Sequence, residues 1–128
     1  MPVIPLRTTL ILDAVASGAT GLLAIVASGF LGWLLELPPG LLLGAGLVLV
    51  PYVLFVIYTA TRAPIPHGAV RVVILANFVW AAASVLLLLS GWVAPNALGV
   101  AFVLAQAAVV GLFGQLQAIA LRRPLAAA

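Results

Sequence analysis

Four long apolar stretches limit what this chain can fold into more than any other feature. Each contains 20 or more residues and is almost free of charge. A helix of that length crosses the hydrocarbon core of a bilayer, which is about 30 Å thick. No stretch alternates with the period of two that a transmembrane β-strand requires. The sequence therefore predicts transmembrane helices over residues 8–35, 41–61, 68–91 and 97–121.

The composition and the short connections extend this prediction to an architecture. Of the 128 residues, 66% are hydrophobic and 5% are charged, whereas about a quarter of the residues of a soluble domain are charged. Short, proline-containing connections make consecutive helices antiparallel neighbours. We expect an all-α fold, a polytopic membrane protein with an antiparallel four-transmembrane-helix bundle, as a single membrane domain over residues 1–128.

The arginines predict the orientation of this bundle. With four crossings, every basic residue falls at the end that holds both termini, namely Arg7, Arg62, Arg71, Arg122 and Arg123. Glu36, Trp33 and Trp92 fall at the opposite end. Because basic residues collect on the cytoplasmic side, we expect a multi-pass protein of the bacterial inner (plasma) membrane with cytoplasmic N- and C-termini. The first stretch is too long for a signal peptide, and we interpret it as a retained span.

Asp13 is the one acid inside an apolar stretch, and it lies on a helix face of small and hydroxyl residues. Such faces usually pack against other membrane helices. Counted from the arginines, Thr59, Asn77 and Gln117 lie at a similar depth. We predict that these four residues form a polar cluster in the cytoplasmic third of the bundle, with Arg71 reaching inward to pair with Asp13.

Two interpretations of this cluster remain open. An intramembrane acid is by default an ion or proton site. Alternatively, Asp13 is a packing residue, hydrogen-bonded to Asn77 or neutralised by Arg7 or Arg71. We favour the packing interpretation, because an acid near the interface costs less than one at the membrane centre.

Four further residues lie nearer the middle of their spans. Pro51 is expected to kink its helix beside Tyr52, which would be a hinge in a transporter, although prolines in membrane helices are usually static. Trp80 and Gln106 lie away from the interfaces and are candidates to line a cavity. The alternatives are that Trp80 fills a gap or faces lipid, and that Gln106 bonds across helices.

The remaining sequence gives no sign of catalysis or of a cofactor. There is no cysteine, and the single histidine, His67, lies in a connection. One histidine and two distant acids do not make a metal or haem site, and no glycine loop is suited to phosphate. We expect no catalytic residue, cofactor or metal, and without a basic cluster beyond Arg122 and Arg123 we expect no nucleic-acid partner.

Two resemblances add to this interpretation. In size and span count the chain is similar to the small multidrug resistance transporters. Those proteins are dimers of four-helix protomers with a glutamate on the first helix. In this chain the acid is Asp13, which lies nearer the interface, and the family's first-helix motif is absent. The segments Leu12-Asp-Ala-Val-Ala-Ser-Gly18 and Ala94-Pro-Asn-Ala-Leu-Gly-Val-Ala-Phe-Val-Leu-Ala-Gln106 resemble small uncharacterised bacterial four-helix inner-membrane proteins. This second resemblance implies a location and no activity.

Three functions follow as expectations. The first is a non-catalytic accessory, scaffold or assembly subunit that packs against other membrane helices, as a homo-oligomer or in a larger complex in the lipid bilayer. The alternative is a small oligomeric proton- or ion-coupled transporter or channel that uses Asp13. A third is a lipid- or hydrophobe-binding membrane protein with a lateral opening near Trp80.

Overall fold

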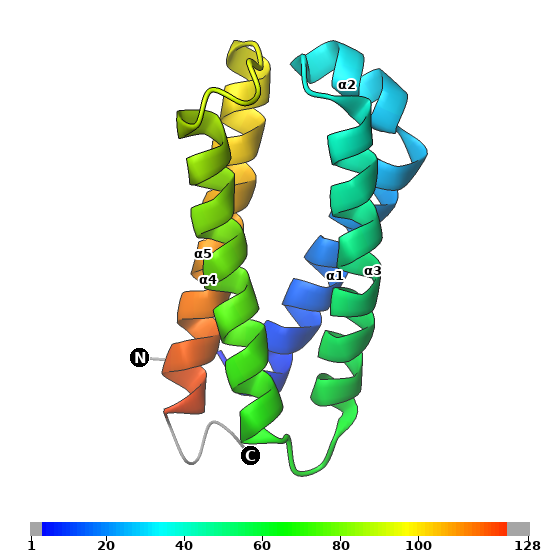
Figure 1. The fold of residues 1–128 in the computed structure, drawn as a ribbon. Coiled ribbons are helices and arrows are strands. Elements are labelled where there is room, and N and C mark those ends of the chain that lie inside the picture. The colour runs from blue at the N-terminus through cyan, green and yellow to red at the C-terminus, as the bar shows by residue number, and fades with distance from the viewer. Residues whose placement is uncertain (1–3, 123–128) are drawn as a thin grey trace.

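The computed structural model describes residues 4–122, and this part of the chain is helical without any strand (Figure 1). Its helices are α1 (Leu6–Val26), α2 (Ser28–Leu35), α3 (Pro39–Thr61), α4 (His67–Leu89) and α5 (Ala97–Leu121). Four of them, α1, α3, α4 and α5, are long and apolar enough to cross a membrane. The all-α, four-span fold expected from the sequence is confirmed. Arg123 lies outside the described residues.

The first apolar stretch differs from the prediction because it is not one helix. The backbone leaves the helical conformation at Ala27, where φ is −110° and ψ is 23°. The Ala-Ser-Gly sequence at 27–29 accounts for this break, since paired glycine and serine residues are common at sharp helix bends. The short helix α2 then lies across the end of the bundle (Figure 1). The prediction of a continuous helix over 8–35 is therefore wrong beyond Val26.

The four long helices are arranged as two pairs, α1 with α3 and α4 with α5 (Figure 1). Although α3 and α4 are consecutive, they have little contact with each other. In the first pair the backbones approach closely at two glycines. A methyl group added to Gly46 would lie 2.8 Å from the carbonyl oxygen of Gly21 and 2.8 Å from Cγ1 of Ile25. Small residues allow this close contact between membrane helices.

We therefore expect Gly46→Ala to lower the free energy of unfolding by about 1.5 kcal/mol, because the added methyl group meets backbone that has little room to move. Gly44→Ala is the matched control on the same helix, since nothing lies within 4 Å of a methyl group there. Denaturant titration in detergent micelles, followed by tryptophan fluorescence, measures both. Equal stability of the two variants would contradict the close packing of α1 on α3.

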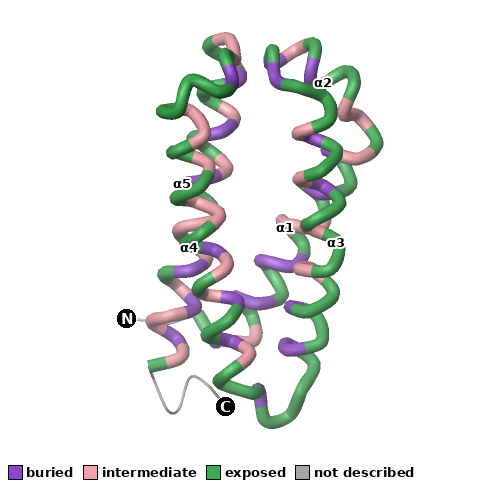
Figure 2. The backbone as a smooth tube through the Cα atoms, in the orientation of Figure 1, coloured by how far each residue is buried: buried purple, intermediate pink, exposed green. Residues whose placement is uncertain are grey.

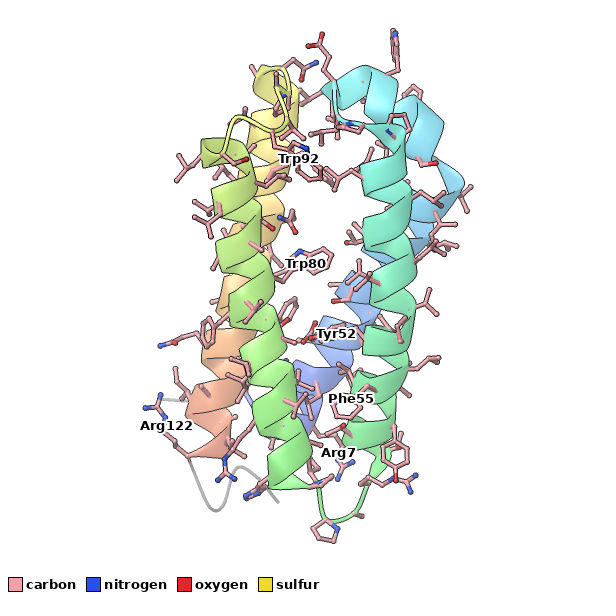
Figure 3. The ribbon with its side chains drawn as sticks, viewed as in Figure 1. Arg7, Tyr52, Phe55, Trp80, Trp92 and Arg122 are labelled. Atoms are coloured by element: carbon pink, nitrogen blue, oxygen red, sulfur yellow. The ribbon has the colours of Figure 1, made fainter. Side chains whose placement is uncertain are left out.

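Two clusters of buried apolar residues join the helix pairs, one toward each end of the bundle, where Figure 2 shows buried positions on the backbone. At the end where α1 begins and α5 ends, the buried core includes Leu6, Leu10, Val56, Val70 and Val73. At the other end, where α2 lies, a smaller core contains Leu35, Leu37, Leu42, Val93 and Val103. The first end also carries Arg7 and Arg122, and the second carries Trp92 (Figure 3).

The end near α2 is also held by hydrogen bonds. Asn96 caps α5 by accepting a hydrogen bond from the Gly99 N–H at 2.8 Å. Its own side-chain amide donates to the carbonyl oxygen of Leu34 at 2.8 Å, and its backbone N–H donates to that of Leu35 at 3.2 Å. The cap of α5 therefore ties the second helix pair to α2.

Candidate functional site

A buried polar cluster joins all four spanning helices around Asp13, which is 1% exposed. Its Oδ2 atom accepts hydrogen bonds from the Tyr52 hydroxyl at 2.7 Å, from Gln117 Nε2 at 2.8 Å and from Asn77 Nδ2 at 3.0 Å. Its Oδ1 atom accepts from the Ser17 hydroxyl at 2.9 Å. We call these five residues the Asp13 cluster. They come from α1, α3, α4 and α5, so the cluster links the two helix pairs.

The partners of Asp13 also bond to one another. Asn77 Nδ2 donates its second hydrogen bond to Gln117 Oε1 at 2.9 Å, and the Tyr52 hydroxyl lies 2.9 Å from Asn77 Oδ1. Among the described residues, no buried side-chain nitrogen or oxygen lacks a hydrogen-bond partner. An unsatisfied polar group buried in an apolar medium is costly, so this closed network is well suited to hold the helices together.

The structure brings together three of the residues that the sequence placed in one cluster, Asp13, Asn77 and Gln117, and it leaves two out. Thr59 is buried, but its hydroxyl donates to the carbonyl oxygen of Phe55, one turn back on α3, at 2.8 Å. Arg71 is exposed and, within residues 4–122, forms no ion pair with Asp13. The expected ion pair was wrong because neutral donors already occupy both carboxylate oxygens.

Arg7 does not neutralise Asp13 either. Its guanidinium donates to the carbonyl oxygens of Ala60 and Arg62, the latter at 3.1 Å. The last carbonyl groups of a helix have no partner within the helix and are favourable sites for a cation. Arg7 therefore acts at the end of α3, and it ties α1 to that end.

The sequence interpretation missed two members of the cluster, although signals for both were present. Ser17 follows Asp13 by four residues, which on a helix places the two side chains on one face. Tyr52 was assigned to a hinge beside Pro51, but its long side chain reaches α1, where its hydroxyl donates to Asp13 Oδ2 at 2.7 Å. Pro51 itself is exposed, and α3 continues through it from Pro39 to Thr61.

Between the Asp13 cluster and the end near α2, a cavity of about 470 Å³ separates the two helix pairs. We call it the lateral cavity. Its walls are almost entirely apolar, and several residues that line it are exposed on the outside, such as Val48 of α3, which is 57% exposed. The cavity therefore opens on the side of the bundle. Its lining includes Ala24, Gly44, Ala45, Val48 and Leu49 on one side and Trp80, Ala83, Leu87, Phe102 and Val103 on the other.

The sequence candidates Trp80 and Gln106 both line this cavity. Trp80 Nε1 donates to Gln106 Oε1 at 2.8 Å, which joins α4 to α5. Gln106 Nε2 donates to the Ser84 hydroxyl oxygen at 2.9 Å and to the Val103 carbonyl oxygen at 2.8 Å. Figure 3 shows the Trp80 ring projecting from α4 toward the other helix pair. These three residues, Trp80, Ser84 and Gln106, form a polar patch in an otherwise apolar wall.

The fold and these two sites define the class: a polytopic α-helical membrane protein whose two helix pairs enclose a lateral apolar cavity. The chain matches no protein-family model, and no curated protein or solved structure is significantly similar to it. The function is therefore inferred from the Asp13 cluster and the lateral cavity.

Proposed function

We propose that this protein binds the hydrophobic part of a lipid-like molecule in the lateral cavity, as a non-catalytic protein of the bacterial inner membrane with both termini in the cytoplasm. The lateral cavity is the observation that carries the proposal. The orientation is supported by the arginines, because Arg7 and Arg122 lie at one end of the bundle (Figure 3) and basic residues favour the cytoplasmic side.

The size and chemistry of the cavity favour an apolar occupant. Its volume of about 470 Å³ falls within the range of about 300–1,000 Å³ that is usual for small-molecule sites. The wall formed by α3 carries small residues, Gly44 and Ala45, which leave room opposite Trp80. An open apolar cavity in the hydrocarbon core gains dispersion contacts when a chain fills it.

Quenching of Trp80 by a brominated fatty-acid chain tests the proposal. Trp33→Phe and Trp92→Phe leave Trp80 as the single tryptophan, since the chain contains three. In detergent micelles we expect the brominated chain to quench Trp80 in a saturable manner, because it enters the cavity beside the ring. Quenching that rises linearly with the brominated fraction of the micelle would contradict the proposal.

Gly44→Phe is the matched test of where the chain binds. Nothing lies within 4 Å of a Cβ atom at Gly44, so a phenylalanine there extends into the cavity without displacing backbone. We expect this variant to lose the saturable quenching, with an apparent affinity at least about tenfold lower. Gly29→Phe, at an equally open and exposed site on α2 outside the cavity, is expected to bind normally.

A second candidate, the accessory or assembly subunit, is favoured by a groove on the outer face of α1 and α3. Small residues form most of the lining of this groove of about 440 Å³, which consists of Ile11, Ala14, Val15, Gly18 and Ala19 of α1 and Ile57, Ala60 and Thr61 of α3. Small residues allow another membrane helix to approach closely. A wild-type protein that shows no saturable quenching but copurifies as an oligomer would favour this candidate over lipid binding.

We do not propose ion-coupled transport through Asp13. Its carboxyl group is 1% exposed, and neutral side chains from all four spanning helices surround it. It is also absent from the lining of the lateral cavity. These features support a structural role for Asp13 in joining the helix pairs.

A further inference from the structure

The polar patch of the lateral cavity has hydrogen-bond acceptors left over but no donors. Gln106 uses both Nε2 protons, on Ser84 and Val103, and Trp80 uses its indole proton on Gln106. The Ser84 hydroxyl donates to the Trp80 carbonyl oxygen at 2.8 Å. Gln106 Oε1 and Ser84 Oγ each accept one of these bonds, and each oxygen has room for a second.

The opposite wall of the cavity likewise offers a hydrogen-bond acceptor but no free donor. Thr20 of α1 lines the cavity, and its hydroxyl donates to the carbonyl oxygen of Ala16 at 2.8 Å. Its proton is therefore committed, while its oxygen retains acceptor capacity. No ionisable side chain is among the described residues that line the cavity. A bound molecule that hydrogen-bonds to the cavity wall must therefore supply the donor and needs no charge.

The depth of the patch excludes a charged headgroup from it. Gln106 lies nine residues into α5 from Ala97, which places it about 14 Å along the helix axis, near the middle of the span. Placing a charge at that depth is costly, and the headgroup of a phospholipid lies at the interface. The acyl chain of a phospholipid carries no donor for the patch.

From these observations we infer that the lateral cavity selects an uncharged long-chain molecule that carries a hydroxyl group, which donates a hydrogen bond to Gln106 Oε1 or Ser84 Oγ. This inference names the ligand class of the proposed function and rests on it. A long-chain alcohol has the required apolar body and a single small donor that is tolerable inside the membrane.

Competition between two matched ligands tests the inference. The Trp80-only protein is loaded with the brominated fatty-acid chain, which is then displaced with hexadecanol or with hexadecyl methyl ether. Both have the same chain, but the ether lacks a donor. Because a neutral hydrogen bond is worth about 0.5–1.5 kcal/mol, we expect the alcohol to displace the quencher at an about 3- to 10-fold lower concentration than the ether.

The double variant Ser84→Ala/Gln106→Leu separates this contact from the partitioning of the ligands into the micelle, which is the same for every variant. The two substitutions remove both acceptors of the patch and free the Trp80 N–H, which serves an ether oxygen and a hydroxyl oxygen equally well. We expect the preference for the alcohol to disappear while the brominated chain still quenches Trp80. Gln115→Leu, at an exposed site on α5 outside the cavity, is the control and is expected to keep the preference.

The possible outcomes distinguish failure of the inferred preference for a hydroxyl group from failure of hydrophobe binding in the lateral cavity. Equal displacement by alcohol and ether in the Trp80-only protein, or an unchanged preference in the Ser84→Ala/Gln106→Leu variant, would overturn the inference and leave hydrophobe binding intact. Failure of the brominated chain to bind saturably in the wild-type background would overturn both.

Discussion

Asp13→Ala is expected to lower the free energy of unfolding in detergent micelles by about 3 kcal/mol. The carboxylate accepts hydrogen bonds from α3, α4 and α5 as well as from its own helix. Its removal leaves the side-chain amides of Asn77 and Gln117, which are 3% and 0% exposed, short of an acceptor. A buried donor left without a partner costs about 1–3 kcal/mol, and hydrogen bonds between membrane helices are at the low end of such values.

Asp13→Asn separates the hydrogen bonds from the charge. The asparagine oxygen can take the place of Oδ2 as the acceptor for Tyr52, Asn77 and Gln117, and its amide can donate to the Ser17 hydroxyl oxygen. We expect this variant to lose less than half as much stability as Asp13→Ala. Both are measured by denaturant titration in the same micelles, followed by helical circular dichroism.

Glu36→Ala is the control for the loss of an acid. Glu36 is exposed at the end of α2, and we expect its removal to change the free energy of unfolding by no more than about 0.5 kcal/mol. If Asp13→Ala were as stable as Glu36→Ala, the Asp13 cluster would not hold the helix pairs together.

Gly99→Ala is expected to lower the free energy of unfolding by about 2.5 kcal/mol, because it separates α5 from α2. A methyl group there would overlap the carbonyl oxygen of Leu35 and would lie 2.6 Å from Cβ of Pro95. That carbonyl oxygen also accepts the backbone hydrogen bond of Asn96. The backbone of Leu35 on one side and the rigid ring of Pro95 on the other leave no flexible side chain to move aside.

Gly111→Ala is the matched substitution on the same helix. The nearest atom to a methyl group at Gly111 is Cβ of Ala81 at 3.9 Å, an ordinary contact. Alanine is a better helix former than glycine, so we expect stability to be unchanged or raised by about 0.5 kcal/mol. A loss of stability in Gly111→Ala as large as that in Gly99→Ala would show that glycine is required along α5 for another reason.

The sequence predicted most of the fold because the length and hydrophobicity of each stretch depend on the bilayer rather than on tertiary contacts. The four long helices therefore follow directly from the apolar stretches. The break at Ala27 did not follow, because an Ala-Ser-Gly sequence is also common inside membrane helices. The contacts of Leu34 and Leu35 with Asn96, 62 residues after Leu34, hold α2 across the end of the bundle, and a single sequence does not reveal them.

Only part of the Asp13 cluster could be predicted, because some of its members depend on contacts between helices rather than on depth in the membrane. Counting depth from the arginines identified Asp13, Asn77 and Gln117 correctly, since depth along a helix depends only on residue number. The same count included Thr59, whose hydroxyl bonds within its own helix instead. It omitted Tyr52, because the reach of a long side chain depends on the distance between neighbouring helices, which a single sequence does not specify.

The lateral cavity was the least predictable feature. Gln106 and Trp80 were recognised as candidates to line a cavity, but its opening between α3 and α4 depends on how the two helix pairs separate. Consecutive helices with a short connection would be expected to pack closely. Here the Asp13 cluster and the contacts between α2 and α5 hold the pairs together at either side of the cavity instead.

Cryo-electron microscopy of the protein in a lipid nanodisc shows whether a long-chain molecule occupies the lateral cavity. We expect elongated density between α3 and α4, lying alongside Trp80 and reaching past Val48, with the Asp13 cluster closed beneath it. Direct packing of α3 on α4, with the Trp80 ring against Ala45 and Val48 and no space between the helix pairs, would contradict this expectation.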